Sequence, residues 1–153
     1  MKSDEGFQMV AAVMTTADAF LRESQRLFRP LGATGAQYNV LNILVQHPEG
    51  LSQRELGDLL VVDRSNVTGL LDRLEKAGLV RRDNHPADRR VYLVMITPAG
   101  QACWEKVHPV YLEAVARITR GLTARQKRET LAVLQRLEAQ SVPARALRKG
   151  SKP

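Results

Sequence analysis

The sequence contains few of the residues from which catalytic and metal sites are usually built. It has one cysteine, Cys103, and three histidines, none of them in a His-x-x-x-His or cysteine-rich spacing. We therefore expect no metal ligand and no cofactor. The motifs Gly-x-Ser-x-Gly, Gly-x-Gly-x-x-Gly and the P-loop are also missing. The sequence thus predicts no catalytic residue and a protein that is not an enzyme.

Other absences concern the membrane and the compartment. No run of apolar residues is long enough to cross a bilayer. The N-terminal stretch MKSDEGFQMV is polar and acidic, unlike a secretory signal. A single cysteine excludes an internal disulfide and suits a reducing compartment, so we expect a cytoplasmic protein without a membrane partner. Cys103 could be a redox sensor, but an inert, half-buried thiol is the role we expect.

Scarce aromatic residues and an excess of positive charge set two further expectations. Aromatics make up only 5% of the 153 residues, so the core must consist mostly of Leu, Val and Ala. This length is sufficient for one domain with a core. The formal net charge of +7 is typical of proteins that meet a polyanion. Charge alone does not separate DNA, RNA and an anionic membrane surface.

The stretch from Leu51 to Thr97 predicts two short helices followed by a basic hairpin. Ser52 and Glu55 form a capping box that opens the first helix, and Asp63 is a suitable N-cap for the second. Gly78 is expected to end the second helix in a left-handed conformation. The apolar residues of the second helix recur at i, i+3, i+4 and i+7, which predicts one buried face, made of Val67, Leu70, Leu71 and Leu74.

The opposite face of the second helix is polar, which suits it to DNA. Serine, threonine and asparagine can bond to base edges, and arginine can pair with guanine. The N-terminal part of such a helix enters the major groove in helix-turn-helix proteins, and a small glycine lets it approach closely. A solvated helix face is the alternative. From this helix pair we expect DNA contacts by Ser52, Gln53, Arg64, Ser65, Asn66, Thr68, Gly69 and Arg73.

The hairpin after the second helix is strongly basic. Residues 79–83 and 89–96 are rich in β-branched and apolar residues, and residues 84–88 favour a turn. Phosphate oxygens or the minor groove would attract arginines at such a tip. The alternative is a hairpin that only solubilises the protein. We expect DNA contacts by Arg81, Asp88, Arg89 and Arg90, with Asp88 orienting an arginine, and Arg82 belongs to the same basic cluster.

This stretch resembles the winged-helix core of the MarR (multiple antibiotic resistance regulator) family. The resemblance rests on LEKAGLV at 74–80, DRR at 88–90 and LVMIT at 93–97. It implies a homodimeric, ligand-responsive transcription factor that binds double-stranded DNA. It also places the family's wing arginine on Arg90, its oriented aspartate on Asp88, and the recognition-helix contacts on Ser65, Asn66, Thr68 and Arg73.

Helical segments flank the DNA-binding stretch. Residues 4–28 carry apolar residues at a heptad-like spacing, and Thr97-Pro98 opens another helix. The predicted fold class is mainly α with a small β-hairpin wing, in a single domain of residues 1–141. Dimerisation helices at 4–31 and 98–141 surround a winged-helix core at 34–97, and the basic tail 142–153 is expected to be disordered. The expected dimer interface comprises Phe7, Val10, Met14, Leu131, Leu134 and Leu137.

The resemblance also implies a ligand pocket between the dimer helices and the winged helix. Trp104, His108 and Tyr111 fall at i, i+4 and i+7, and Tyr38 and Phe20 could join them. Such a group could hold a flat, anionic aromatic molecule. The alternative is that these residues form a core stripe or a dimer seam.

Together these features predict a sequence-specific, homodimeric DNA-binding regulator, most simply a repressor released by a small ligand. A twofold dimer matches an operator that is an inverted repeat. One alternative is an architectural DNA-binding protein without an effector, which would bind mixed-sequence DNA nearly as well as an operator. The other is a winged-helix module that binds proteins and not DNA.

Overall fold

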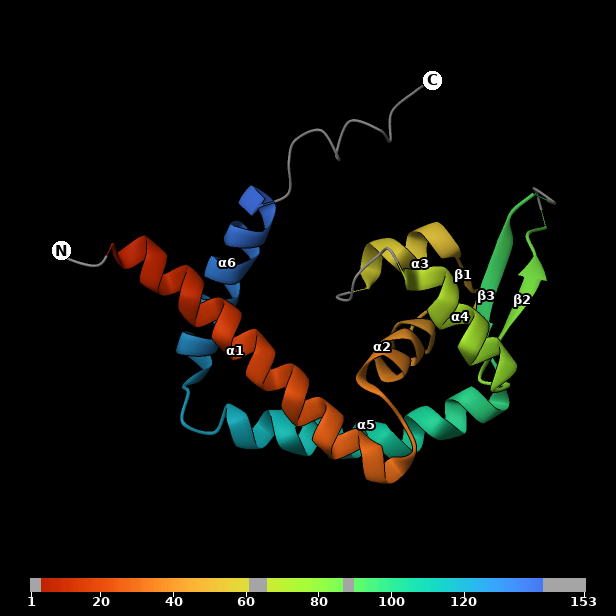
Figure 1. Cartoon of the computed structure of the whole chain (residues 1–153), viewed down its shortest axis with the longest axis horizontal. Coiled ribbons are helices and arrows are strands. Elements are labelled where there is room, and N and C mark those ends of the chain that lie inside the picture. The colour runs from red at the N-terminus through yellow and green to blue at the C-terminus, as the bar shows by residue number, and fades with distance from the viewer. Residues whose placement is uncertain (1–3, 61–65, 87–89, 142–153) are drawn as a thin grey trace, which may run out of the picture. The chain divides into compact units, whose positions relative to one another are not determined.

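The computed structural model describes residues 4–60, 66–86 and 90–141 (Figure 1). They form two compact units, which divide between Ala114 and Val115. The elements of the first unit are α1 (Glu5–Phe28), η1 (Arg29–Leu31), α2 (Gly35–Leu44), β1 (Leu51–Ser52), α3 (Gln53–Leu59), α4 (Val67–Lys76), β2 (Val80–Asn84), β3 (Tyr92–Ile96) and most of α5 (Pro98–Ile118). The second unit holds the end of α5 and α6 (Ala124–Ser141).

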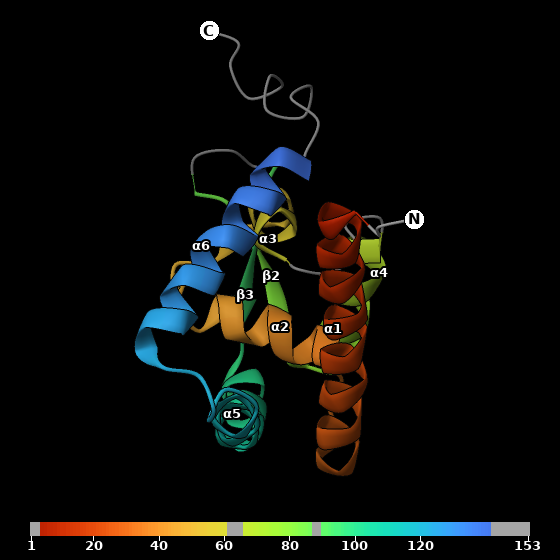
Figure 2. The same cartoon turned by 90° about the vertical axis from the view of Figure 1, so that its left-hand side faces the viewer.

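The predicted fold class is confirmed: the chain is mainly helical, and its strands form a small antiparallel sheet in the order β1-β3-β2. Figure 2, which views α5 end on, shows β2 and β3 side by side. Leu51 pairs with Val94, so a short strand precedes the first of the two predicted helices. The second strand of the hairpin begins at Tyr92, not at residue 89. The division into a single domain at 1–141 stays a prediction, and the tail 142–153 lies outside the described residues.

Local side-chain bonds set the helix starts, as the sequence predicts for the capping box of Ser52 and Glu55. The Asp4 carboxylate accepts from the N–H of Gly6 at 3.0 Å and begins α1. The Thr97 hydroxyl accepts from the N–H of Gly100 at 3.0 Å at the start of α5. Reciprocal capping boxes begin three more helices, satisfying backbone groups that have no partner within the helix; they pair Thr34 with Gln37, Ser52 with Glu55 and Thr123 with Gln126.

The core of the first unit lies beneath α4 and the sheet. Its buried members among the described residues are all Leu or Val, which confirms the expectation of an aliphatic core. The predicted inner face of α4 is buried throughout, with Leu71 and Leu74 at 0% exposure. A smaller cluster around Phe28, Tyr38 and Val107 holds α1, α2 and α5 together. The polar face of α4 therefore points away from the core.

A close joint connects the end of α4 to the start of α5. Gly78 has a φ of 71°, the left-handed conformation expected of it, and its carbonyl accepts from the Thr97 hydroxyl at 2.6 Å. The Leu79 carbonyl accepts from the N–H of Thr97 at 3.1 Å. A Cβ on Gly100 would meet that same carbonyl oxygen at 2.0 Å, so only glycine fits there. The joint fixes the direction in which α5 leaves the sheet.

No helix among the described residues is long and apolar enough to span a membrane.

Candidate nucleic-acid interface

Four of the residues that we predict to contact DNA lie on the exposed side of α4. Asn66, Thr68 and Arg73 are exposed, and Gly69 lies partly buried among them. Asn66 occupies the N-cap position without a side-chain capping bond. The predicted cap Asp63 and the predicted contacts Arg64 and Ser65 lie outside the described residues.

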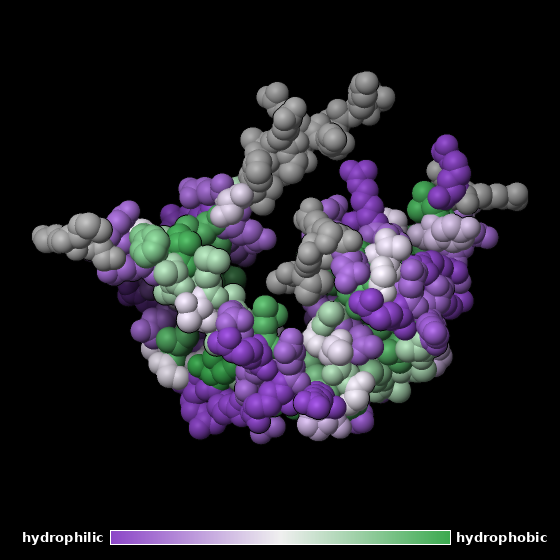
Figure 3. All heavy atoms as spheres, in the orientation of Figure 1, coloured by the Kyte–Doolittle hydropathy of each residue, from purple (hydrophilic) through white to green (hydrophobic). Residues whose placement is uncertain are grey.

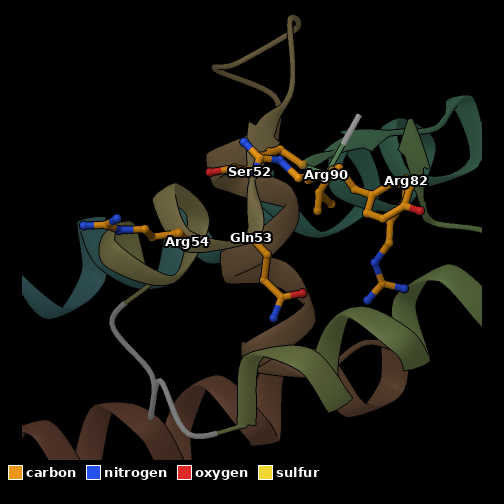
Figure 4. A pocket seen from close by; sticks show the side chains of 8 residues that line it. Ser52, Gln53, Arg54, Arg82 and Arg90 are labelled. Atoms are coloured by element: carbon orange, nitrogen blue, oxygen red, sulfur yellow. The ribbon is translucent and has the colours of Figure 1, made fainter. Parts of the chain in front are cut away.

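Gln53 on α3 positions Thr68 on α4. The Gln53 amide nitrogen donates to the Thr68 hydroxyl oxygen at 2.6 Å, and Figure 4 shows Gln53 pointing toward α4. Because that oxygen accepts from Gln53, its own proton is left to donate elsewhere. The two helices thus present one hydroxyl donor together with the carbonyl oxygen of the Gln53 amide.

Gly69 makes room for its neighbours on the helix. A Cβ at this position would lie 2.8 Å from the Asn66 amide oxygen and 3.5 Å from Nη1 of Arg73. The missing side chain therefore lets an amide and a guanidinium converge over one turn of α4. The sequence had suggested only that Gly69 lets the helix approach DNA.

The groove between the start of α3 and the wing has a volume of about 350 Å³. Figure 4 shows Arg90 and Arg82 on its wing side and Arg54 extending away from them on its α3 side. Its lining comprises Ser52, Gln53, Arg54, Arg82, Arg90, Val91, Tyr92 and Val94. Arg54 and Tyr92 line the groove but belong to no motif, so the sequence did not single them out. Asp88 and Arg89 lie outside the described residues.

Ser52 lines this groove as a helix cap. Its N–H donates to the Glu55 carboxylate at 2.8 Å and its hydroxyl donates to the same oxygen at 2.7 Å. These bonds hold the pKa of the Glu55 carboxyl below its ordinary value. Both donors of Ser52 are thus engaged within the capping box.

The arginines of β2 point in different directions, as alternation along a strand requires. Arg81 is exposed and pairs with Asp83 at 2.9 Å. Arg82 turns toward α4, where it binds Asp72 at 2.6 Å and also Glu75. The hydrogen bonds that the Arg82 guanidinium donates to Asp72 and Glu75 raise its pKa, so it stays charged. Arg82, a member of the predicted basic cluster on the hairpin, therefore takes part in an ion-pair network with α4.

An aromatic cluster lies at the junction of α1, α2 and α5. The Tyr38 hydroxyl is 2.8 Å from Nδ1 of His108, and the His108 ring stacks on Trp104 with centroids 4.3 Å apart. Tyr38 and Tyr111 have ring centroids 4.9 Å apart. Burial raises the pKa of Tyr38 to about 12. Four of the five residues predicted for the ligand pocket are thus brought together.

The fifth, Phe20, is not part of this cluster. It is 48% exposed, whereas Phe28 is 1% exposed and packs on Tyr38 with ring centroids 5.1 Å apart. The chain turns back at Arg29–Leu31, directly after Phe28. Phe20 lies about 12 Å from Phe28 along the axis of α1. The packed rings also resemble the core stripe that the sequence left as an alternative.

Exposed apolar side chains cover α1 and α6. On α1, Phe7 is 71%, Val10 49% and Met14 69% exposed, and Figure 3 shows hydrophobic atoms at the surface over this helix. On α6, Leu131 and Leu134 are 56% and 41% exposed, and Leu137 is partly exposed. Exposed apolar side chains that gather on a helix are typical of a site of interaction.

Comparisons with known proteins agree with this geometry. The sequence profile of the MarR family matches residues 31–91. The chain is 29% identical over 122 residues to the putative transcriptional regulatory protein for the hcr operon of Thauera aromatica, across 80% of this chain and 73% of that protein. The crystal structure of CouR from Rhodococcus jostii RHA1 bound to p-coumaroyl-CoA is 25% identical, with a TM-score of 0.76, and covers 90% of this chain and 95% of that chain.

A further solved structure extends the likeness over nearly the whole chain. The MarR family transcriptional regulator from Silicibacter pomeroyi is 30% identical, with a TM-score of 0.68, and the match covers 90% of each chain. The terminal helices are therefore shared as well as the winged helix. These relatives are regulators and not enzymes. The chain belongs to the MarR family of winged-helix, DNA-binding transcriptional regulators.

Proposed function

We propose that two copies of this chain bind an inverted-repeat operator in double-stranded DNA and repress transcription until a small ligand releases them. Such a regulator would act in the cytoplasm. The observation that carries the proposal is the exposed polar face of α4, set beside an arginine-lined groove under the wing.

In this proposal α4 is the recognition helix. Asn66, Thr68 and Arg73 project from its exposed face and supply the amide, hydroxyl and guanidinium groups that read base edges in the major groove. Gly69 lets them converge. Arg64 and Ser65 precede this face in the sequence and join the proposed set.

The phosphate backbone would follow the groove between α3 and the wing. Arg54 and Arg90 line that groove, and Arg81 lies exposed on the wing. Arginine neutralises phosphates and releases counterions, which contributes to the affinity for every DNA sequence. We assign Arg90, with Asp88 and Arg89, to the wing's minor-groove contact.

The apolar faces of α1 and α6 would pair with those of a second copy. Phe7 and Met14 are the most exposed large hydrophobic residues of α1, at 71% and 69%. Burying them removes apolar area from water, which is favourable by roughly 25 cal/mol per Å². A twofold dimer places its two recognition helices on half-sites about 10 base pairs apart, hence an inverted repeat.

The effector would be a small aromatic anion bound near the aromatic cluster of α2 and α5. The crystal structure of the solved relative CouR shows that protein bound to p-coumaroyl-CoA, whose acyl group carries an aromatic ring. Trp104 and His108 offer stacked rings beside the Tyr38 hydroxyl. A ligand releases DNA only if it binds the DNA-incompetent shape more tightly.

Selection of bound duplexes from a random DNA pool tests the proposal. We expect an inverted repeat to emerge, and mixed-sequence DNA to compete at least about 1,000-fold less well than the selected site, the lower end for specific regulators. Competition by random DNA at nearly equal strength would favour the architectural protein. The absence of DNA binding at low salt would favour the protein-interaction module.

A further inference from the structure

An ion-pair network joins the wing to α4. The two terminal nitrogens of Arg82 on β2 reach separate carboxylates on α4, Asp72 at 2.6 Å and Glu75. The N–H of Arg82 also donates to Glu75 at 3.1 Å. One residue of the wing therefore makes three bonds to two successive turns of the helix, as Figure 4 indicates by the direction of its side chain.

This network differs from an ordinary surface ion pair. An exposed pair between two flexible side chains contributes little, but the Arg82 side chain is only 22% exposed. Charge-assisted bonds from a planar guanidinium to two acceptors fix its orientation. On the neighbouring strand β3, the residue opposite Arg82 is Val94, which is 1% exposed. The backbone that carries Arg82 is thus anchored in the core.

The place of Asp72 and Glu75 on α4 makes the network relevant to DNA. Asp72 follows Thr68 by four residues and Gly69 by three, so it shares their side of the helix. Two carboxylates there would repel phosphates unless another role outweighs that cost. Holding Arg82 is the role that the structure displays.

We propose that Arg82 is a positioning residue for operator recognition, which sets the wing at a fixed angle to α4 by holding Asp72 and Glu75. The inference rests on the proposed function, because it assumes that α4 and the wing contact one DNA site together. With the network intact, the major-groove contacts of α4 and the minor-groove contacts of the wing occur in a single rigid arrangement. Without the network, Arg81 and Arg90 of the wing remain, but the wing no longer has a fixed orientation relative to α4.

A purely electrostatic role for Asp72 and Glu75 predicts an opposite change in DNA affinity for one variant. If Asp72 and Glu75 acted only by their charge, the double variant Asp72→Asn/Glu75→Gln would bind DNA more tightly, since two negative charges near phosphates are removed. If they hold the wing, the same variant binds the operator less tightly. Arg82→Gln weakens binding under both accounts and does not separate them alone.

The experiment measures operator affinity and chemical protection for Arg82→Gln, Arg82→Lys, Asp72→Asn/Glu75→Gln and the triple variant. We expect Arg82→Gln, Arg82→Lys and the double variant each to lose about tenfold in operator affinity, which lies within the range of coupling energies between neighbouring charged residues. The triple variant, which combines Arg82→Gln with the double variant, should show no further loss. Hydroxyl-radical protection in the minor groove should disappear, while guanine N7 protection in the major groove is retained. Arg82→Lys should not restore binding, because an ammonium cannot span both carboxylates.

Arg26→Gln is the matched control, since it removes one positive charge and one ion pair, with Glu23 at 2.8 Å, from α1. It should leave affinity and both protection patterns unchanged. Thermal unfolding checks the fold of each variant, and the double variant carries the sign test should Arg82→Gln not fold. Tighter binding by the double variant, or multiplying losses in the triple variant, would overturn the positioning role. Loss of all operator preference in the unmodified protein would instead overturn the proposed function.

Discussion

At the scale of single residues, the bond between Gln53 and Thr68 turns a helix face into a directed donor. Thr68→Val keeps the shape of the side chain and removes the hydroxyl that Gln53 bonds at 2.6 Å. We expect operator affinity to fall by about 1–3 kcal/mol, the value of one base contact, with little change on random DNA. Competition binding with both DNAs measures the difference.

Thr119→Val is the control for this variant, because the Thr119 hydroxyl donates to the backbone carbonyl of Val115 at 2.9 Å and lies outside the proposed DNA-binding residues. Gln53→Ala should lose less than Thr68→Val, since it frees the hydroxyl without removing it. Equal losses on operator and random DNA would assign Thr68 to backbone contact and not to base reading.

Residue-level predictions succeeded where the interaction is local in sequence. Capping boxes such as Ser52 with Glu55 connect residues three apart, so the sequence alone identifies them. The partners of Arg82 could not be identified in this way. Asp72 and Glu75 lie ten and seven residues before it, and the pairing depends on the turn at Gly78 and on the direction in which β2 leaves it.

At the scale of elements, the wing should contribute sequence-independent affinity. Arg90→Ala is expected to weaken binding to all DNA sequences. It should also reduce the slope of log affinity against log salt by about one per lost phosphate contact, because fewer counterions are released. Titrations at several salt concentrations give the slope. Arg125→Ala on α6, which loses an exposed pair with Glu129 at 2.7 Å, removes the same charge and should leave the slope unchanged.

The elements themselves follow closely from periodicity and caps. The inner face of α4 and the extent of α1 agree with the predictions, because each depends on spacing within one helix. Membership of the aromatic cluster was predicted less well. The spacing on α5 correctly grouped Trp104 with His108, but Phe28 takes the place expected for Phe20. Which phenylalanine packs on Tyr38 depends on where the chain turns back, at Arg29–Leu31. Helical periodicity carries no information on the place of that turn.

At the scale of the whole molecule, the apolar surface of α1 should determine assembly. Phe7→Glu/Met14→Glu places charges on side chains that are 71% and 69% exposed in the single chain. We expect these charges to leave the isolated fold intact and to prevent association, since each would be buried without a partner. Sedimentation should show monomers with much weaker operator binding.

Gln25→Glu adds a negative charge to an exposed position of the same helix and should leave the association state unchanged. Deleting α1 through Phe28 is a less specific test, because Phe28 is 1% exposed and its loss would open the aromatic cluster. A double variant that sediments as a dimer with native affinity would remove α1 from the dimer interface.

The same scale connects ligand binding to DNA release through Trp104. It is the only tryptophan in the chain, its Nε1 donates to Asn42 at 3.1 Å, and its ring stacks on His108. A ligand that enters this cluster must disturb one of these contacts, so small aromatic carboxylates that bind should shift the tryptophan emission. Linkage then requires that the ligand weaken operator binding by the factor by which operator DNA weakens the ligand. Fluorescence titrations with and without operator, beside operator binding with and without ligand, measure both factors. Trp104→Phe should abolish the optical signal and retain ligand-dependent release, because the phenyl ring of phenylalanine preserves the stacking on His108.

A compound that saturates the emission change while operator affinity stays constant would show a binding site that is not coupled to DNA.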